Sequence, residues 1–499
     1  MHKKGIKITT LVTILLLIYS CIKTTTYLAP NEAEKISTAK KIIIAMADGT
    51  EFELKNAFLV DEKLIGYTKT KEKKEFALSA IKSVRIEKMN TGYVFLFGGV
   101  AVVAAWLIIG AATAPEPPPS ECCPFIYSFD GHQYVFDAEP YGGAICQGLA
   151  RTEWCELENL KEVNGQYKIL IENQLNETQY TDELKLVVVD HPQGVKVAPD
   201  NLGCIHSISN PGSPLRALDK HGRNILPLID KKDGKFWEAE LEPNISAENL
   251  REELLLEFPK PSGVKKAKLW VNGCTTLWGS QVAREFLRLF GNELPKWYSD
   301  VNSLGTAYQQ ITSWYLREEL YLLQIRVKEK DGWKSKGLIY GGGPMASEDK
   351  AYAFDVSDVT GDMLRIRLTP ASQFWKIDYL ALDYGDNLPL DVIEVNALEA
   401  VDCDGRDIRD LLSLRDHNYL VMPKIGDSAE VVFTAPAQEP GTKRSIFLKA
   451  SGYYNIHLEP DGEPQRETIS RIFNEPGFTA HFAYQEFLKW KNGNKKMIQ

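Results

Sequence analysis

One stretch near the N-terminus constrains this chain more than any other. Residues 92–114, GYVFLFGGVAVVAAWLIIGAATA, contain no charged side chain, and a proline-rich linker at 115–121 follows directly. An α-helix of about 20 apolar residues spans the hydrocarbon core of a bilayer and satisfies its own backbone polar groups there. We therefore predict a membrane helix over 92–114, which the prolines end.

Small residues in this run permit close helix contact, and with it a homo-oligomer formed through the apolar helix. The residues that define the predicted membrane element are Gly92, Gly98, Gly99, Trp106 and Gly110. The alternative is a buried central helix of a soluble domain.

Residues 1–21 are typical of a secretory signal peptide, with an early lysine cluster and then a short apolar run. The end of the segment, Leu17-Ile18-Tyr19-Ser20-Cys21, resembles the lipobox of bacterial lipoproteins. That resemblance implies a mature protein that begins at Cys21 with acyl chains such as palmitate. It also implies an envelope location, and Ile22, which is not the retaining aspartate, favours the outer membrane. The alternative is an ordinary signal peptide with a chance cysteine.

The two membrane features disagree about topology. Lys82, Arg85 and Lys88 precede the apolar run, so the positive-inside rule places that side in the cytoplasm. A lipidated Cys21 places the same side outside it. Insertion into the outer membrane or into an oligomer resolves the disagreement.

The composition limits the classes of partner. The net charge is −9, and no long basic tract interrupts the 499 residues, which argues against nucleic acid as a partner. We expect the lipid bilayer, and other envelope proteins or glycans, as partners.

The rest of the chain predicts a mainly β fold. Residues 22–39 are polar and form a predicted spacer, and 40–90 contain short alternating runs typical of a small SH3-like β module. We predict a first β-rich domain over 122–300 that ends in a helix, and a second, β-sandwich-like domain over 301–499 with a C-terminal helical piece.

Three local patterns support this reading. Alternating aromatics on both sides of Asp130-Gly131 predict a β-hairpin at 125–136. Apolar residues on one face, followed by Gly291, predict a helix at 279–290. Weaker patterns predict helices at 303–319 and 479–491.

Three blocks resemble a family of uncharacterised bacterial envelope lipoproteins: CPFIYSFDGHQYVFDAEPYGGAI, VNGQYKILIENQLNETQYTDELKLVVVDHP and IFLKASGYY. The resemblance implies an envelope address and a β-sandwich build. It implies no activity and no catalytic residue.

The densest acidic cluster is a candidate calcium site. Asp402, Asp404 and Asp407 surround a glycine turn, and calcium takes hard oxygen ligands. The ligand order of an EF-hand is absent, so a solvated turn is the stronger interpretation. We predict no other cofactor.

Aromatic side chains that are exposed can stack on sugar rings. The candidates for such a carbohydrate-binding surface are Trp237, Trp270, Trp333 and Trp375. The competing interpretation places them in the core.

No nucleophile motif, phosphate loop or paired histidine set identifies an enzyme, and no catalytic residue is assigned. The leading hypothesis is a non-catalytic envelope protein for interaction or assembly. A carbohydrate-binding protein is the alternative, and a hydrolase without a recognisable motif is the third.

Overall fold

The computed structural model describes residues 23–28, 41–46, 50–60, 63–68, 73–89, 123–239, 250–318, 322–459 and 461–497. Cys21, the predicted membrane helix at 92–114 and the linker at 115–121 lie outside these residues. Within them, no helix combines the length and the apolar character needed to cross a membrane. The chain forms two compact units, Met1–Pro115 with His132–Tyr134, and Glu116–Gly131 with Val135–Gln499.

The first unit contains one antiparallel sheet in the order β1-β6-β2-β3-β4-β5. Its strands are β1 (Lys23–Leu28), β2 (Lys41–Met46), β3 (Glu51–Val60), β4 (Lys63–Tyr67), β5 (Lys73–Ala77) and β6 (Ile81–Met89). Ile42, Leu54 and Leu64 are among the fully buried side chains of its small core. The predicted spacer is corrected here, because residues 23–28 form β1 and pair with β6.

The described part of the second unit contains two pairs of sheets. We call the pair that begins nearer the N-terminus the first sheet pair, and the other the inserted sheet pair. One of its sheets has the order β24-β26-β10-β7-β8, and the other has the order β23-β11-β27-β9 with β25 beside β11. The strands are β7 (Phe125–Phe129), β8 (Tyr134–Ala138), β9 (Arg151–Glu156), β10 (Gln166–Glu172), β11 (Glu177–His191), β23 (Asp391–Val395), β24 (Ala397–Asp402), β25 (Leu420–Met422), β26 (Ser428–Thr434) and β27 (Lys443–Ile456). The hairpin predicted at 125–136 is confirmed as β7 and β8.

The inserted sheet pair lies in sequence between β11 and β23. Its sheets have the orders β14-β16-β21-β18-β19 and β15-β22-β17-β20. The strands are β14 (Arg216–Leu218), β15 (Trp237–Glu238), β16 (Leu254–Pro259), β17 (Lys266–Thr275), β18 (Leu322–Glu329), β19 (Gly332–Tyr340), β20 (Glu348–Asp355), β21 (Met363–Thr369) and β22 (Trp375–Asp383). A separate hairpin, β12 (Lys196–Pro199) and β13 (Ile205–Ile208), connects β11 to this pair.

This topology corrects the predicted division into 122–300 and 301–499. The predicted boundary falls inside helix α7 (Leu294–Asn302). Strands from the two predicted domains pair directly, as β10 does with β26 and β17 does with β22. The second unit is therefore a continuous structure in which one sheet pair interrupts the sequence of the other.

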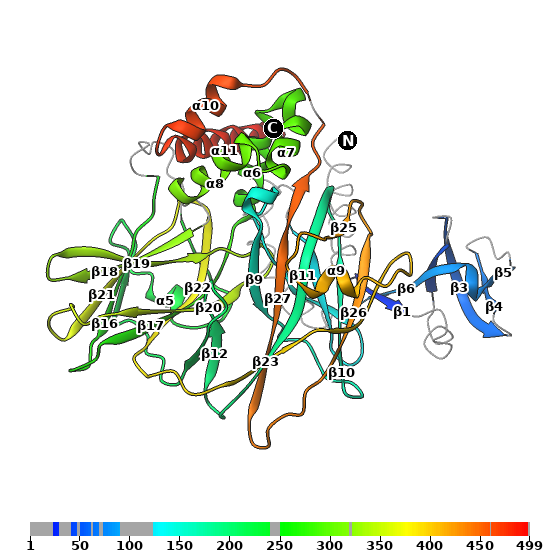
Figure 1. Ribbon diagram of the computed structural model, residues 1–499, viewed down its shortest axis with the longest axis horizontal. Coiled ribbons are helices and arrows are strands. Elements are labelled where there is room, and N and C mark those ends of the chain that lie inside the picture. Colours follow the sequence, from blue (N-terminus) through cyan, green and yellow to red (C-terminus); the bar gives the residue numbers. More distant parts are fainter. Residues whose placement is uncertain are drawn as a thin grey trace, which may run out of the picture. The chain divides into compact units, whose positions relative to one another are not determined.

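Helices gather over one end of the sheets (Figure 1). They are α6 (Leu277–Arg288), α7, α8 (Thr306–Glu318), α10 (Arg466–Asn474) and α11 (Phe478–Met497). Phe286 stacks on Trp314 at a centroid distance of 5.4 Å and also meets Phe473 edge-on. Contacts of this kind favour burial of large rings. The helices predicted at 279–290, 303–319 and 479–491 are confirmed.

Candidate functional site

The structure separates the four candidate tryptophans. Trp237 and Trp375 are each 3% exposed and belong to the main apolar core. Trp333 is half-buried, and the Arg367 guanidinium lies 4.1 Å from its ring centroid. Trp270 lines an open cleft.

Arginine side chains pair with the carboxylates of the candidate calcium site. The Asp402 carboxylate accepts a hydrogen bond from Arg406 Nε at 2.7 Å and others from main-chain N–H groups. Asp407 pairs with Arg409 over 2.6 Å, and Asp404 lies 3.4 Å from Arg406. These pairs place cations where a calcium ion would need free oxygens.

The two sheet pairs meet where β9 runs against β20. Residues alternate between the two faces of a strand. On β9, Glu153 and Cys155 are buried, and Trp154 and Glu156 lie on the opposite face. This alternation creates a buried polar cluster on one face of the contact and one wall of an open cleft on the other.

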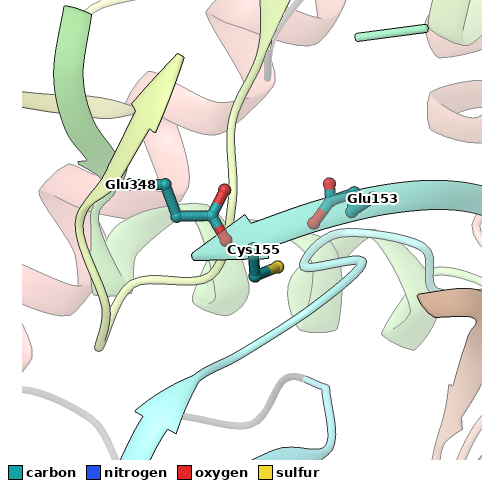
Figure 2. A group of neighbouring side chains, drawn as sticks. All are labelled: Glu153, Cys155 and Glu348. Atoms are coloured by element: carbon teal, nitrogen blue, oxygen red, sulfur yellow. The ribbon is translucent and has the colours of Figure 1, made fainter. Parts of the chain in front are cut away.

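The buried cluster contains Glu153, Cys155 and Glu348, and Glu348 extends from β20 towards β9 (Figure 2). One ligand atom from each of the three lies within 4.8 Å of the others. Glu348 Oε2 lies 2.9 Å from Lys350 Nζ, and Glu153 Oε1 accepts a hydrogen bond from Arg151 Nε at 2.6 Å. Each carboxylate therefore has its own cation, which offsets the cost of burying the charge.

This composition makes the cluster a poor place for a metal ion. The ligand set of two carboxylates and a thiol suits a divalent cation in principle. However, Lys350 and Arg151 already supply the positive charge, and burial raises the pKa of the Cys155 thiol well above its usual value. A protonated thiol is a weak metal ligand. We interpret the cluster as structural.

Two glycines of the run Gly341-Gly342-Gly343-Pro344, Gly342 and Gly343, lie in crowded surroundings next to this cluster. A Cβ atom on Gly142 would lie 2.8 Å from the main chain of Gly343, so the two backbones approach too closely for side chains. A Cβ on Gly342 would meet the Glu348 carboxyl carbon at 3.1 Å. Thr275 Oγ1 donates to the Gly342 carbonyl over 2.6 Å and holds the run in place.

The cleft beside the cluster has a volume of about 570 Å³. The indole of Trp270 contacts the Tyr379 ring edge-on at a centroid distance of 5.0 Å. Trp270 is 9% exposed, and its indole N–H has no hydrogen-bond acceptor among the described residues. The indole N–H is itself enclosed by protein, so what Trp270 and Tyr379 give the cleft is an aromatic wall.

Several acidic groups line the cleft. Burial raises the pKa of Glu156 to about 7, and the neighbouring Asp349 carboxylate adds to the rise. Lys232 Nζ lies 2.9 Å from Glu158 and 3.3 Å from Asp349. Asn272 donates a further hydrogen bond to Asp349 at 2.7 Å. Asp349 is therefore fixed in place, and Glu156 can exchange a proton near neutral pH.

Basic groups also line the cleft. Burial lowers the pKa of His191, and the Lys196 and Lys443 ammonium groups lower it further. Both lysines line the cleft with His191. A ligand in the cleft therefore meets both carboxylates and ammonium groups.

Of these cleft residues, the sequence analysis identified only Trp270. The missed residues are Glu156, Glu158, His191, Lys196, Lys232, Asp349, Tyr379 and Lys443. The sequence signal was weak, namely charges placed inside strands at 151–156 and 348–355.

Comparisons with known proteins do not assign the chain to a family. No family model and no curated protein matches the chain. Among solved structures, it resembles a GH31 alpha-xylosidase from Xanthomonas citri over 80% of its own length and 31% of that chain, with 10% identity and a TM-score of 0.16. It also resembles a chain of Sulfolobus Turreted Icosahedral Virus over 69% of its own length and 100% of that chain, with 9% identity and a TM-score of 0.12. The chain spans about a third of the xylosidase. TM-scores this low carry no inference about fold or function.

Proposed function

We propose that this chain is a non-catalytic, lipid-anchored protein of the bacterial outer membrane whose β-sandwich body binds a carbohydrate. The observation that carries the proposal is the cleft between the two sheet pairs, with Trp270 and Tyr379 in its wall. Binding sites that combine an aromatic surface with a few fixed polar groups are typical of small polar ligands.

The chemistry of the cleft suits a sugar. A pyranose ring offers C–H groups that pack on aromatic faces, and hydroxyls that both donate and accept hydrogen bonds. Asp349 accepts such bonds, and Lys232 donates them. Lys196 and Lys443 add a preference for a sugar that carries a carboxylate or a phosphate.

Binding is tested with the full-length chain in detergent on an array of neutral and acidic oligosaccharides. We expect acidic oligosaccharides to be retained, and we expect Trp270→Ala to abolish retention. Trp333→Ala is the matched control, since Trp333 lies outside the cleft. Because Trp270 also packs in the core, Lys443→Gln provides a second test on an exposed residue. An array with no bound oligosaccharide contradicts the proposal.

The anchor is tested separately. We propose that Cys21 carries acyl chains and that residues 92–114 insert in a membrane. Full-length protein should sediment with envelopes and incorporate labelled palmitate, and Cys21→Ser should lose the label. Wild-type protein that carries no label and stays freely soluble contradicts the proposed anchor. The binding proposal is then still decided by the oligosaccharide array alone.

A hydrolase is the second candidate, and one observation favours it. Burial and the neighbouring Asp349 carboxylate raise the pKa of Glu156 to about 7, and a carboxyl group that keeps its proton near neutral pH is one of the two that glycoside cleavage uses. Release of reducing sugar by the wild type, abolished in Glu156→Gln with binding retained, would replace the non-catalytic proposal. Binding of the oligosaccharide without release of reducing sugar supports the non-catalytic proposal.

A further inference from the structure

Three side chains in the wall of the cleft form a hydrogen-bonded chain. Glu156 is on β9, Ser445 is on β27 and His191 ends β11, and all three line the cleft. These strands are neighbours in one sheet, in the order β11-β27-β9 (Figure 1). The contacts therefore run across the sheet from one strand to the next.

The strand register explains why these side chains meet. Residues directly opposite each other in an antiparallel pair point to the same face, and so do residues two apart on one strand. Glu156 is opposite Phe447, and His191 is opposite Lys443. Ser445 lies midway between Phe447 and Lys443 on β27. Its side chain is therefore on the same face as Glu156 and His191, diagonally next to each.

Two contacts define the neutral form of His191. Its Nδ1 lies 3.3 Å from the Pro192 carbonyl oxygen, and its Nε2 lies 3.3 Å from Ser445 Oγ. A carbonyl oxygen only accepts hydrogen bonds, so Nδ1 carries the proton of the neutral ring and Nε2 is an acceptor. Neutral His191 therefore needs the Ser445 hydroxyl as its donor.

The Ser445 hydroxyl cannot serve two acceptors, because one O–H group donates one hydrogen bond. It also hydrogen-bonds the Glu156 carboxyl. When it donates to neutral His191, Glu156 must be protonated and donate to Oγ. When it donates to ionised Glu156, His191 must be protonated at Nε2. Each fully hydrogen-bonded form of the chain therefore holds one exchangeable proton, and losing that proton leaves a hydrogen bond unmade.

The charges around Glu156 help the chain to keep this proton near neutral pH. Burial and the carboxylates of Asp349 on β20 and of Glu158 raise the pKa of Glu156 to about 7. Lys232, which precedes β15, and the Ser445 hydroxyl act in the opposite direction. The net effect is a proton that exchanges within the ordinary pH range.

The charges around His191 attract an anion. Burial lowers the pKa of His191, and the ammonium groups of Lys196 on β12 and Lys443 on β27 lower it further. The one neighbouring carboxylate named among these effects, Asp190, is paired with Arg444 over 2.7 Å. Lys196 and Lys443 therefore remain to bind a carboxylate or phosphate of the ligand beside the imidazole.

We propose, building on the proposed function, that the Glu156–Ser445–His191 chain makes the binding of an acidic sugar in this cleft depend on one proton. With its proton the chain carries no net charge. Without it the chain carries a negative charge, which repels the anionic group of the ligand. Affinity is therefore highest at acid pH and falls as the pH rises through about 7, and the ligand binds together with a proton.

The test is calorimetric titration of the full-length chain in detergent with trigalacturonate, whose carboxylates stay ionised between about pH 6 and about pH 8.5. We expect the dissociation constant to rise about tenfold over this range, the effect of one pKa unit of linkage. Near neutral pH we expect proton uptake, seen as a binding enthalpy that changes with the ionisation enthalpy of the buffer. Maltotriose, which is uncharged, is the control ligand and should show no such rise.

Two variants test the chain itself. Glu156→Gln should abolish the pH dependence, because its amide donates to Ser445 Oγ at every pH. His191→Gln should move the midpoint to lower pH, because the introduced amide can donate to Ser445 and leave its hydroxyl to an ionised Glu156. The matched controls are Glu162→Gln and His457→Gln, at exposed residues outside the cleft, and both should keep the wild-type dependence.

Equal trigalacturonate affinity at both ends of the pH range, or binding without proton uptake, overturns this inference and leaves the proposed function standing. A midpoint unchanged in His191→Gln overturns the chain and assigns the dependence to Glu156 alone. Failure of trigalacturonate to bind at any pH also overturns the inference, and the oligosaccharide array then decides the proposed function separately.

Discussion

Lys350 Nζ on β20 donates a hydrogen bond to the main-chain carbonyl of Trp154 on β9 over 2.8 Å. The same ammonium lies 2.9 Å from Glu348. One lysine thus connects the two sheet pairs and neutralises a buried carboxylate. The cleft that we assign to ligand binding opens on the other face of these two strands.

Lys350→Met should destabilise the chain strongly. It leaves Glu348 buried without its cation, and breaking such a pair costs about 3–5 kcal/mol. Chemical denaturation measures the loss. Lys330→Met is the control, because Lys330 forms an exposed pair with Asp358 whose contribution is at most about 1 kcal/mol.

The double variant Glu348→Leu/Lys350→Met distinguishes charge from packing. Removing both charges leaves no unpaired ion, so it should recover most of the stability that the single variant loses. A double variant as unstable as Lys350→Met would show that the unpaired Glu348 charge does not cause the destabilisation.

Gly142→Ala should destabilise by about 1–3 kcal/mol, as overpacking does. Its Cβ would lie 2.8 Å from the main chain of Gly343, and backbone at that position cannot rotate away. Gly212→Ala is the control, since the nearest atom to its Cβ is 3.8 Å away. Equal thermal midpoints for the two variants would contradict the close approach.

Glu177→Gln should remove a pH dependence of stability. Burial raises the pKa of Glu177 from 4.5 to about 8, so the folded state holds a proton that the unfolded state releases. The stability from this proton is complete below pH 4.5 and is lost as the pH rises through about 8. Relative to Glu177→Gln, the wild type should lose about 5 kcal/mol over this range, since one pKa unit is worth about 1.4 kcal/mol.

The exposed Glu162→Gln should follow the wild-type curve at every pH. Parallel curves for wild type and Glu177→Gln would mean that the Glu177 carboxyl ionises without cost.

Local patterns in the sequence predicted much of the secondary structure. The Asp130-Gly131 turn and the spacing of Val282 and Phe286 each encode an element within a few residues. The predicted spacer is wrong because the β-branched threonines within 23–28 favour a strand. The division at 300 and 301 was wrong because β10 pairs with β26, and pairing across such a separation leaves no local trace.

The candidate site was hidden for the same reason. Glu156 and Asp349 are two of 67 acidic residues, and only the contact of β9 with β20 brings them into one cleft. Trp270 was identified from its type alone, within a set whose other members are buried or paired with an arginine.

The central claim is that a carbohydrate occupies the cleft at Trp270. The most direct measurement is fluorine NMR of full-length protein labelled with 5-fluorotryptophan, with resonances assigned through Trp270→Phe and Trp333→Phe. Titration with the acidic oligosaccharide retained on the array should shift the Trp270 resonance and leave that of Trp333 unchanged. A Trp270 resonance that stays in place while the oligosaccharide binds would contradict the account.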